Sequence, residues 1–205
     1  MNTRSQAGQD IFVLSVLKNK QNGIFLEIGS SHPENINNTY ILEKFYNWKG
    51  IMVEYDYNFL PLYKLIRPKS LHIMEDATTV NFKNEFEMLE LPNNIDYLQI
   101  DLEVINRSTL TVLENLDRDV MNNYKFAVVT FEHDIYSGDY FDTRTISRNI
   151  FEKRGYVRVF SDVKNEDNPY EDWYVHPELV DMEYINNIKT EESLEWTNII
   201  TRITN

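Results

Sequence analysis

Apolar and polar residues alternate along the chain in a way that predicts strands and helices in turn. Short apolar runs bounded by turn residues have the length of buried parallel strands. These runs fall at residues 24–28, 51–54, 71–74, 95–100 and 124–131. Between them, apolar residues recur near helical spacing. The predicted helices cover residues 10–18, 39–46, 58–65, 81–90, 108–116 and 143–154.

The end of the chain departs from this alternation. Residues 156–160 alternate as a strand and residues 173–175 form another, which predicts a late hairpin. Strands that alternate with helices form a doubly wound α/β sheet. We find no linker, internal repeat or low-complexity tract, so residues 1–205 are predicted to be one Rossmann-like domain.

Acidic residues end the predicted strands. Glu27 and Glu54 close the first two, Asp76 follows the third, Asp101 the fourth, and Glu132 ends the fifth. Ligands of open α/β sheets bind at the carboxyl ends of the strands. An acid at one strand end is often a cap or an ion-pair partner, but such a row predicts a ligand site.

The first strand-to-helix turn narrows the choice of ligand. Gly29 is followed by Ser30, and no further glycine occurs before Gly50. The three-glycine dinucleotide fingerprint and the phosphate-binding loop are therefore both absent, which counts against NAD and FAD. S-adenosylmethionine (SAM) contains ribose and adenine without phosphate, and its sulfonium and ammonium suit an acidic edge.

Composition limits the remaining function classes. The formal net charge of −13 argues against a nucleic-acid partner, since phosphate binding needs a basic face. The absence of cysteine excludes disulfides and thiolate metal sites and fits a cytoplasmic location. We expect neither a signal peptide nor a membrane span, because no apolar run is long enough.

Several motifs together resemble the FkbM-type SAM-dependent methyltransferases. They are Ser5-Gln6-x-Gly8-Gln9-Asp10, Phe25-Leu26-Glu27-Ile28-Gly29, Asn37-Asn38-Thr39, Val53-Glu54, Asp76-Ala77, Asp101-Leu102-Glu103 and Arg154-Gly155-Tyr156. The resemblance covers most of the chain. It implies a class I methyltransferase fold of about seven strands with an antiparallel last hairpin. It also implies O-methylation of a sugar hydroxyl in a glycan or glycoconjugate.

The resemblance also implies which residues bind SAM. Glu27 and Gly29 would border its methionine part, Glu54 its ribose and Asp76 its adenine. Three more residues of the same loops belong to this predicted site, namely Ser30, Ala77 and Asp101. The single glycine departs from the usual first motif of methyltransferases. The chain also resembles glycan methyltransferases encoded by large DNA viruses, which would place it in the host cytoplasm.

A second group of residues is predicted to carry the chemistry. Asp101 ends the fourth strand, and Glu132 and His133 follow the fifth, so the three could converge. In one interpretation His133 is the general base that takes the proton of the acceptor hydroxyl. In the alternative, all three hold Mg or Mn, which lowers the hydroxyl pKa. In a third interpretation, His133 is a surface histidine in an acidic loop.

Aromatic side chains near these loops could stack on a sugar. They are Tyr136, Tyr140, Phe141, Trp173 and Tyr174. Arg144 and Arg148 lie one helical turn apart and more often pair with nearby acids than face a site. Alternative functions are methylation of a small-molecule phenol or natural product, a nucleotide-sugar or NAD-linked enzyme, and a non-catalytic interaction module. The sequence does not determine the acceptor sugar or the oligomeric state.

Overall fold

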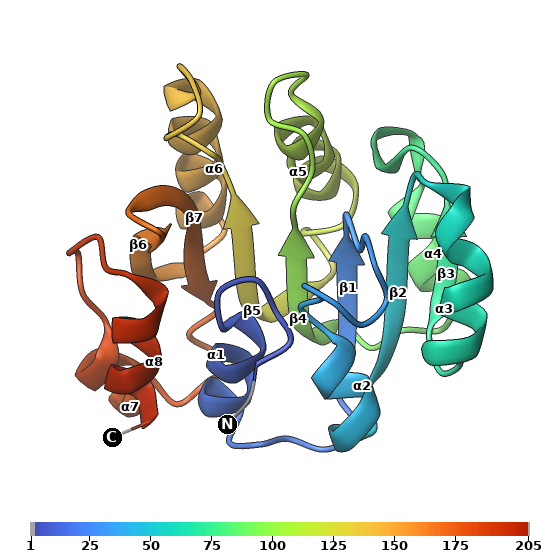
Figure 1. Ribbon diagram of the computed structural model, residues 1–205, viewed down its shortest axis with the longest axis horizontal. Coiled ribbons are helices and arrows are strands. Elements are labelled where there is room, and N and C mark those ends of the chain that lie inside the picture. The colour runs from blue at the N-terminus through green and yellow to red at the C-terminus, as the bar shows by residue number, and fades with distance from the viewer. Residues whose placement is uncertain (1–2, 205) are drawn as a thin grey trace.

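The computed structural model describes residues 3–204 and shows seven strands in one sheet with helices on both faces (Figure 1). The strand order is β3-β2-β1-β4-β5-β7-β6. The strands are β1 Ile24–Ile28, β2 Lys49–Glu54, β3 Leu71–Met74, β4 Asn94–Ile100, β5 Lys125–Glu132, β6 Val157–Asn165 and β7 Asn168–Val175. The first five strands are parallel, while β7 runs antiparallel to β5 and to β6. This order confirms the predicted Rossmann-like α/β fold with an antiparallel last hairpin.

Two apolar cores lie on the two faces of the sheet. The helices are α1 Gln9–Val16, α2 Tyr40–Tyr46, α3 Leu60–Ile66, α4 Phe82–Met88, α5 Ser108–Asp119, α6 Phe141–Lys153, α7 Met182–Ile188 and α8 Trp196–Thr204, with short 3-10 turns at Tyr57–Phe59 and Ala77–Thr79. Helices α1, α2, α3, α7 and α8 contribute to one core. Helices α4, α5 and α6 contribute to the other core. Because the strands are covered on both sides, neither face of a strand has to be polar, which explains their continuous apolar runs.

The final third of the chain differs most from the prediction. Strands β6 and β7 are longer than expected and are joined at Glu166 and Asp167, whose φ angles are 54° and 65°. Two successive positive φ angles are the backbone of a two-residue hairpin turn, which usually carries asparagine and glycine. Helices α7 and α8 were not predicted. None of the helices within residues 3–204 is long and apolar enough to cross a membrane.

Candidate functional site

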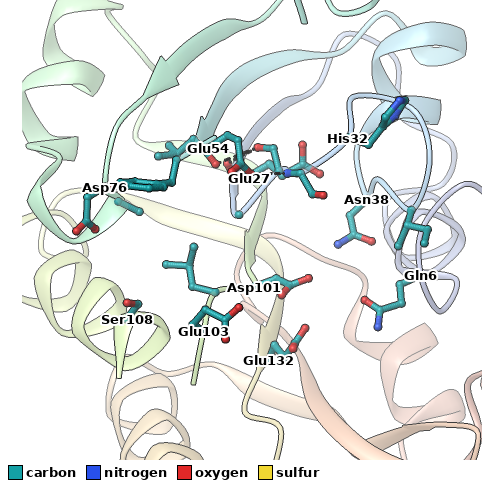
Figure 2. A pocket seen from close by; sticks show the side chains of 18 of the residues that line it. Gln6, Glu27, His32, Asn38, Glu54, Asp76, Asp101, Glu103, Ser108 and Glu132 are labelled. Carbon is teal, nitrogen blue, oxygen red and sulfur yellow. Dashed lines mark hydrogen bonds between the residues drawn. The ribbon is translucent and has the colours of Figure 1, made fainter. Parts of the chain in front are cut away.

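A cavity of about 850 Å³ opens at the carboxyl ends of the parallel strands (Figure 2). It is lined by every residue predicted to bind SAM, namely Glu27, Gly29, Ser30, Glu54, Asp76, Ala77 and Asp101. Asp76 lies at one end of the cavity, Gln6 and Asn38 lie at the other, and Glu27 and Asp101 lie between them. These side chains were predicted to share one edge of the sheet, and in the structure they line one cavity at that edge.

Gly29 shapes the floor of this cavity. Its φ angle is +82°, and its N–H donates to the carbonyl of Val53 at 3.0 Å. A Cβ atom at this position would lie 1.7 Å from the carbonyl oxygen of Asp101. The chain after β1 can approach the chain after β4 this closely only because residue 29 has no side chain.

Glu54 and Asp76 are held by backbone groups at two further strand ends. The two oxygens of Glu54 accept from the N–H groups of Ser31 at 2.7 Å and Asp56 at 2.8 Å. Asp76 accepts from the N–H and the hydroxyl of Thr78, and both bonds end on Oδ1. These bonds favour the ionised form and lower the pKa of Asp76. Among residues 3–204 no side chain occupies its Oδ2, which therefore remains available to a ligand.

Glu27 sits deeper, in a buried polar network. Its Oε2 accepts from the Thr39 hydroxyl at 2.8 Å and from the Asn37 amide at 3.2 Å. Thr39 occupies the N-cap position directly before α2, but its hydroxyl donates to Glu27 and does not cap the helix. Desolvation raises the pKa of Glu27 to about 7, against the opposing charge of the buried Arg67. Glu27 is thus poised to change charge near neutral pH.

Asp101 and Glu132 form a carboxyl pair facing the cavity. Burial raises the pKa of Asp101 to about 6, while a hydrogen bond from Glu132 opposes that shift. The pKa of Glu132 lies well above its ordinary value because the side chain is desolvated and faces the charge of Asp101. Asp134 belongs to the same group, since burial raises its pKa and a hydrogen bond from Glu132 opposes that shift. Glu132 has the most strongly raised pKa of the three, so near neutral pH Glu132 is the protonated member and Asp101 is an ionised acceptor.

The cavity has one sign of charge. Eight carboxyl side chains line it, and within the described residues no lysine or arginine does. These eight are Glu27, Glu54, Glu75, Asp76, Asp101, Glu103, Glu132 and Asp134. Such a surface attracts cationic ligands and repels phosphate. The arrangement disfavours the pyrophosphate of NAD and the diphosphate of a nucleotide sugar.

His133 does not lie in this cavity. Successive side chains of a strand point to opposite faces, so Glu132 faces the cavity while His133 is fully buried away from it. The predicted convergence of Asp101, Glu132 and His133 is therefore not observed. His133 lies instead with Asp162 and Asp172, whose Oδ1 atoms are 3.4 and 3.6 Å from its Nε2.

This second group has the residue types of a metal site. Neither ring nitrogen of His133 has a hydrogen-bond partner within residues 3–204. However, Arg148 donates to Asp172 at 2.7 and 2.8 Å and to Asp162 at 2.8 Å, and Arg144 donates to Asp162 at 3.0 Å. Two guanidinium groups already neutralise the two carboxylates, so a divalent ion would add uncompensated charge to a buried site. The group fits an ion-pair cluster that ties α6 to the hairpin, and the arginines pair with acids as expected.

The aromatic residues divide into two sets. Trp173 and Tyr174 are fully buried core residues and are not available to a sugar. Tyr136 and Phe141 are about half exposed, at the β5 end and the start of α6. Tyr140, the fifth predicted ring, is partly buried, and none of the five lines the cavity. Tyr136 and Phe141 are the most accessible of these rings to an acceptor.

Sequence reasoning missed the side chains that line the cavity from loops outside the sheet. Gln6 and Asn38 both line it, and the Oδ1 atom of Asn38 is buried without a partner among the described residues. Gln6 is exposed because Asp10 and Gln9 hold the loop around it. The Asp10 carboxylate accepts from Thr3, Arg4 and Ser5. This motif is part of the family resemblance, but nothing in its composition shows which of its side chains faces a ligand.

Glu171, next to this loop, gives a stability prediction. Its Oε1 accepts from Gln9, Tyr170 and Trp173, and burial raises its pKa to about 8. The unfolded chain therefore loses this proton first, and stability falls as pH rises from about 4.5 to about 8. The Glu171→Gln variant removes that cost and should exceed wild type by about 2 kcal/mol in free energy of unfolding at pH 9, with little difference at pH 4.5.

Denaturant unfolding at the two pH values measures this difference. Glu178→Gln is the matched control, since that carboxylate is exposed, pairs with Lys125 and should give no gain at pH 9. A Glu171→Gln variant that is less stable than wild type at pH 9 would show that the charged form is favoured in the folded protein.

Comparison with known proteins identifies the fold. No protein-family model matches the sequence, and no curated protein does. Among solved structures, a Streptococcus mutans protein named as a methyltransferase and solved in complex with SAH has a TM-score of 0.52 and 14% identity over 85% of this chain and 97% of its own. The TehB-like SAM-dependent methyltransferase of Corynebacterium glutamicum has a TM-score of 0.51 and 9% identity over 82% and 87%. This chain has the class I methyltransferase fold.

The same architecture is shared more widely. A protein of the NADB-Rossmann superfamily from Streptococcus agalactiae has a TM-score of 0.52 and 12% identity over 85% of this chain and 69% of its own. The fold alone does not choose between ligands. The choice rests on the cavity of this chain.

Proposed function

We propose that this protein is a SAM-dependent O-methyltransferase that acts on a hydroxyl of a neutral sugar in a glycan or glycoconjugate. The observation that carries the proposal is an acidic cavity at the strand ends of a methyltransferase fold. Six of the seven motifs that resemble the FkbM type contribute residues to this cavity. The seventh, Arg154-Gly155-Tyr156, contacts Asp117, Asn122 and Phe126 near the start of β5, away from the cavity.

The residues of the cavity fit an adenosyl ligand. Glu54 stands at the end of β2, where its carboxylate can accept from ribose hydroxyls. The free Oδ2 of Asp76 can accept from the adenine amino group. At the opposite end, the unpartnered buried Oδ1 of Asn38 is an acceptor for an ammonium group. Leaving such an atom unpaired is costly, which supports a ligand donor at this point.

The carboxyl pair supplies the proton chemistry. SAM, when bound, would supply a methyl group carried on its sulfonium sulfur. As the C–O bond to the acceptor forms, the C–S bond breaks, and the sulfur leaves as a neutral thioether. The ionised Asp101 accepts the proton of the acceptor hydroxyl as the new bond forms. Glu132 donates a hydrogen bond to Asp101 and holds it in place. His133, buried on the other face of the sheet, has no part in this step.

The acceptor is expected to be neutral. No lysine or arginine lines the described cavity to bind a phosphate or a carboxylate, and nucleic acid is disfavoured for the same reason. The exposed rings of Tyr136 and Phe141 offer apolar faces near the end of β5. Sugars present C–H faces to such rings and hydroxyls to carboxylates.

Methyl transfer from labelled SAM tests the proposal. The protein is incubated with methyl-labelled SAM and with neutral oligosaccharides, sugar phosphates or simple phenols, and the methylated product is identified by mass spectrometry. We expect label on a sugar oxygen of a neutral oligosaccharide. If only phenols were labelled, the acceptor would be a phenol and the proposed sugar acceptor would be wrong. The absence of label with every acceptor would contradict the proposed reaction.

A further inference from the structure

One residue at the cavity has a backbone conformation that its residue type rarely adopts. Ile36 has a φ angle of 52°, in the left-handed region. The Cβ substituents of a β-branched residue clash with the backbone there, so isoleucine in this region is an outlier. Glycine or asparagine would be the ordinary choice.

The surrounding structure forces this conformation. Residues 30–39 form the loop after β1, and the loop is pinned on both sides of Ile36. The buried Arg67 donates to the carbonyl of Pro33 at 3.2 Å and to Asn37 Oδ1 at 2.8 Å. The N–H of Asn37 donates to the carbonyl of Arg4 at 2.9 Å. Strain persists where neighbouring contacts fix the chain, and it is concentrated at functional sites.

The strained conformation does not bury the side chain of Ile36 in the core. Its side chain is 68% exposed, yet it lines the acidic cavity. An exposed apolar side chain in a strained conformation stabilises nothing within the chain itself. It becomes useful only when a ligand covers it.

We propose that Ile36 is a ligand-contact residue, held in strain so that its side chain packs against the adenosyl ligand in the cavity. This inference rests on the proposed function. Ile36 supplies an apolar contact at a cavity whose other side chains are mostly charged or amide groups. Covering roughly half of an isoleucine side chain is worth about tenfold in affinity.

The test measures stability and ligand affinity in the same variants. Ile36→Asn relieves the strain and removes the apolar contact, while Ile36→Gly repeats the loss of contact without adding a polar group. The probe is S-adenosylhomocysteine (SAH), titrated by calorimetry. The control is Leu65→Gln, since Leu65 is 77% exposed on α3 and does not line the cavity.

We expect opposite changes in the two measurements. Ile36→Asn should raise the unfolding temperature by about 2–4 °C, the effect expected for relief of one strained residue in a chain of this size. The same variant, and Ile36→Gly, should raise the Kd for SAH about tenfold. Leu65→Gln should leave the Kd unchanged.

Other outcomes overturn the inference in distinguishable ways. A higher unfolding temperature with an unchanged Kd would show that Ile36 does not contact the ligand. An unfolding temperature that fails to rise in Ile36→Asn would show that the conformation is not strained. If wild type itself does not bind SAH, the proposed function fails and the inference fails with it.

Discussion

Replacing Asp101 by asparagine is expected to lower the rate of methyl transfer by about two to four orders of magnitude. The amide cannot accept the proton of the acceptor hydroxyl, although it occupies the same space. The side chain of Glu132 would still lie beside it. The rate is measured with labelled SAM and the neutral oligosaccharide that accepts the methyl group.

The matched variant is Glu132→Gln. Its amide N–H can still donate a hydrogen bond to Asp101, so the expected loss is about tenfold or less. The wild-type rate should rise with pH through about 6, where Asp101 loses its proton, and then level off. If Asp101→Asn retained wild-type activity, Asp101 would not be the base. A larger loss in Glu132→Gln than in Asp101→Asn would exchange the roles of the two residues.

The Gly29→Ala variant is expected to lose about 3 kcal/mol or more in free energy of unfolding. The new Cβ would lie 1.7 Å from the Asp101 carbonyl oxygen, so β1 and β4 would have to separate at the cavity. The φ angle of +82° adds backbone strain for any residue other than glycine. Denaturant unfolding at neutral pH measures the loss.

Gly155→Ala is the control for this variant. Gly155 has a φ angle of +85°, but no atom lies within 4 Å of the position of its Cβ. It therefore isolates the backbone strain, with an expected loss of about 1 kcal/mol. Equal losses in the two variants would mean that the ends of β1 and β4 move apart at little cost.

The acidic edge was predictable because parallel strands end at the same side of a sheet. Glu27, Glu54 and Asp101 could be placed together from strand ends alone, before any contact was known. The position of His133 was also open to prediction, since it follows Glu132 in an extended segment and alternation sends it to the opposite face. The error was to group residues by their distance along the sequence.

Other features could not be predicted from local patterns. The turn at Glu166 and Asp167 lacks the glycine that usually marks a hairpin, so the strands on either side appeared shorter. Gln6 and Ile36 face the cavity because Asp10, Arg67 and the carbonyl of Arg4 fix their loops. Such long-range contacts leave no periodic signal in the sequence.

Calorimetric titration of SAH tests the central claim, that this cavity binds the adenosyl ligand of a methyltransferase. We expect wild type to bind SAH in the micromolar range, with or without EDTA. The Glu54→Ala variant should bind at least about tenfold more weakly, because it lacks the carboxylate proposed to accept from the ribose hydroxyls. The account would be contradicted if wild type gave no binding heat with SAH under either condition and none with SAM.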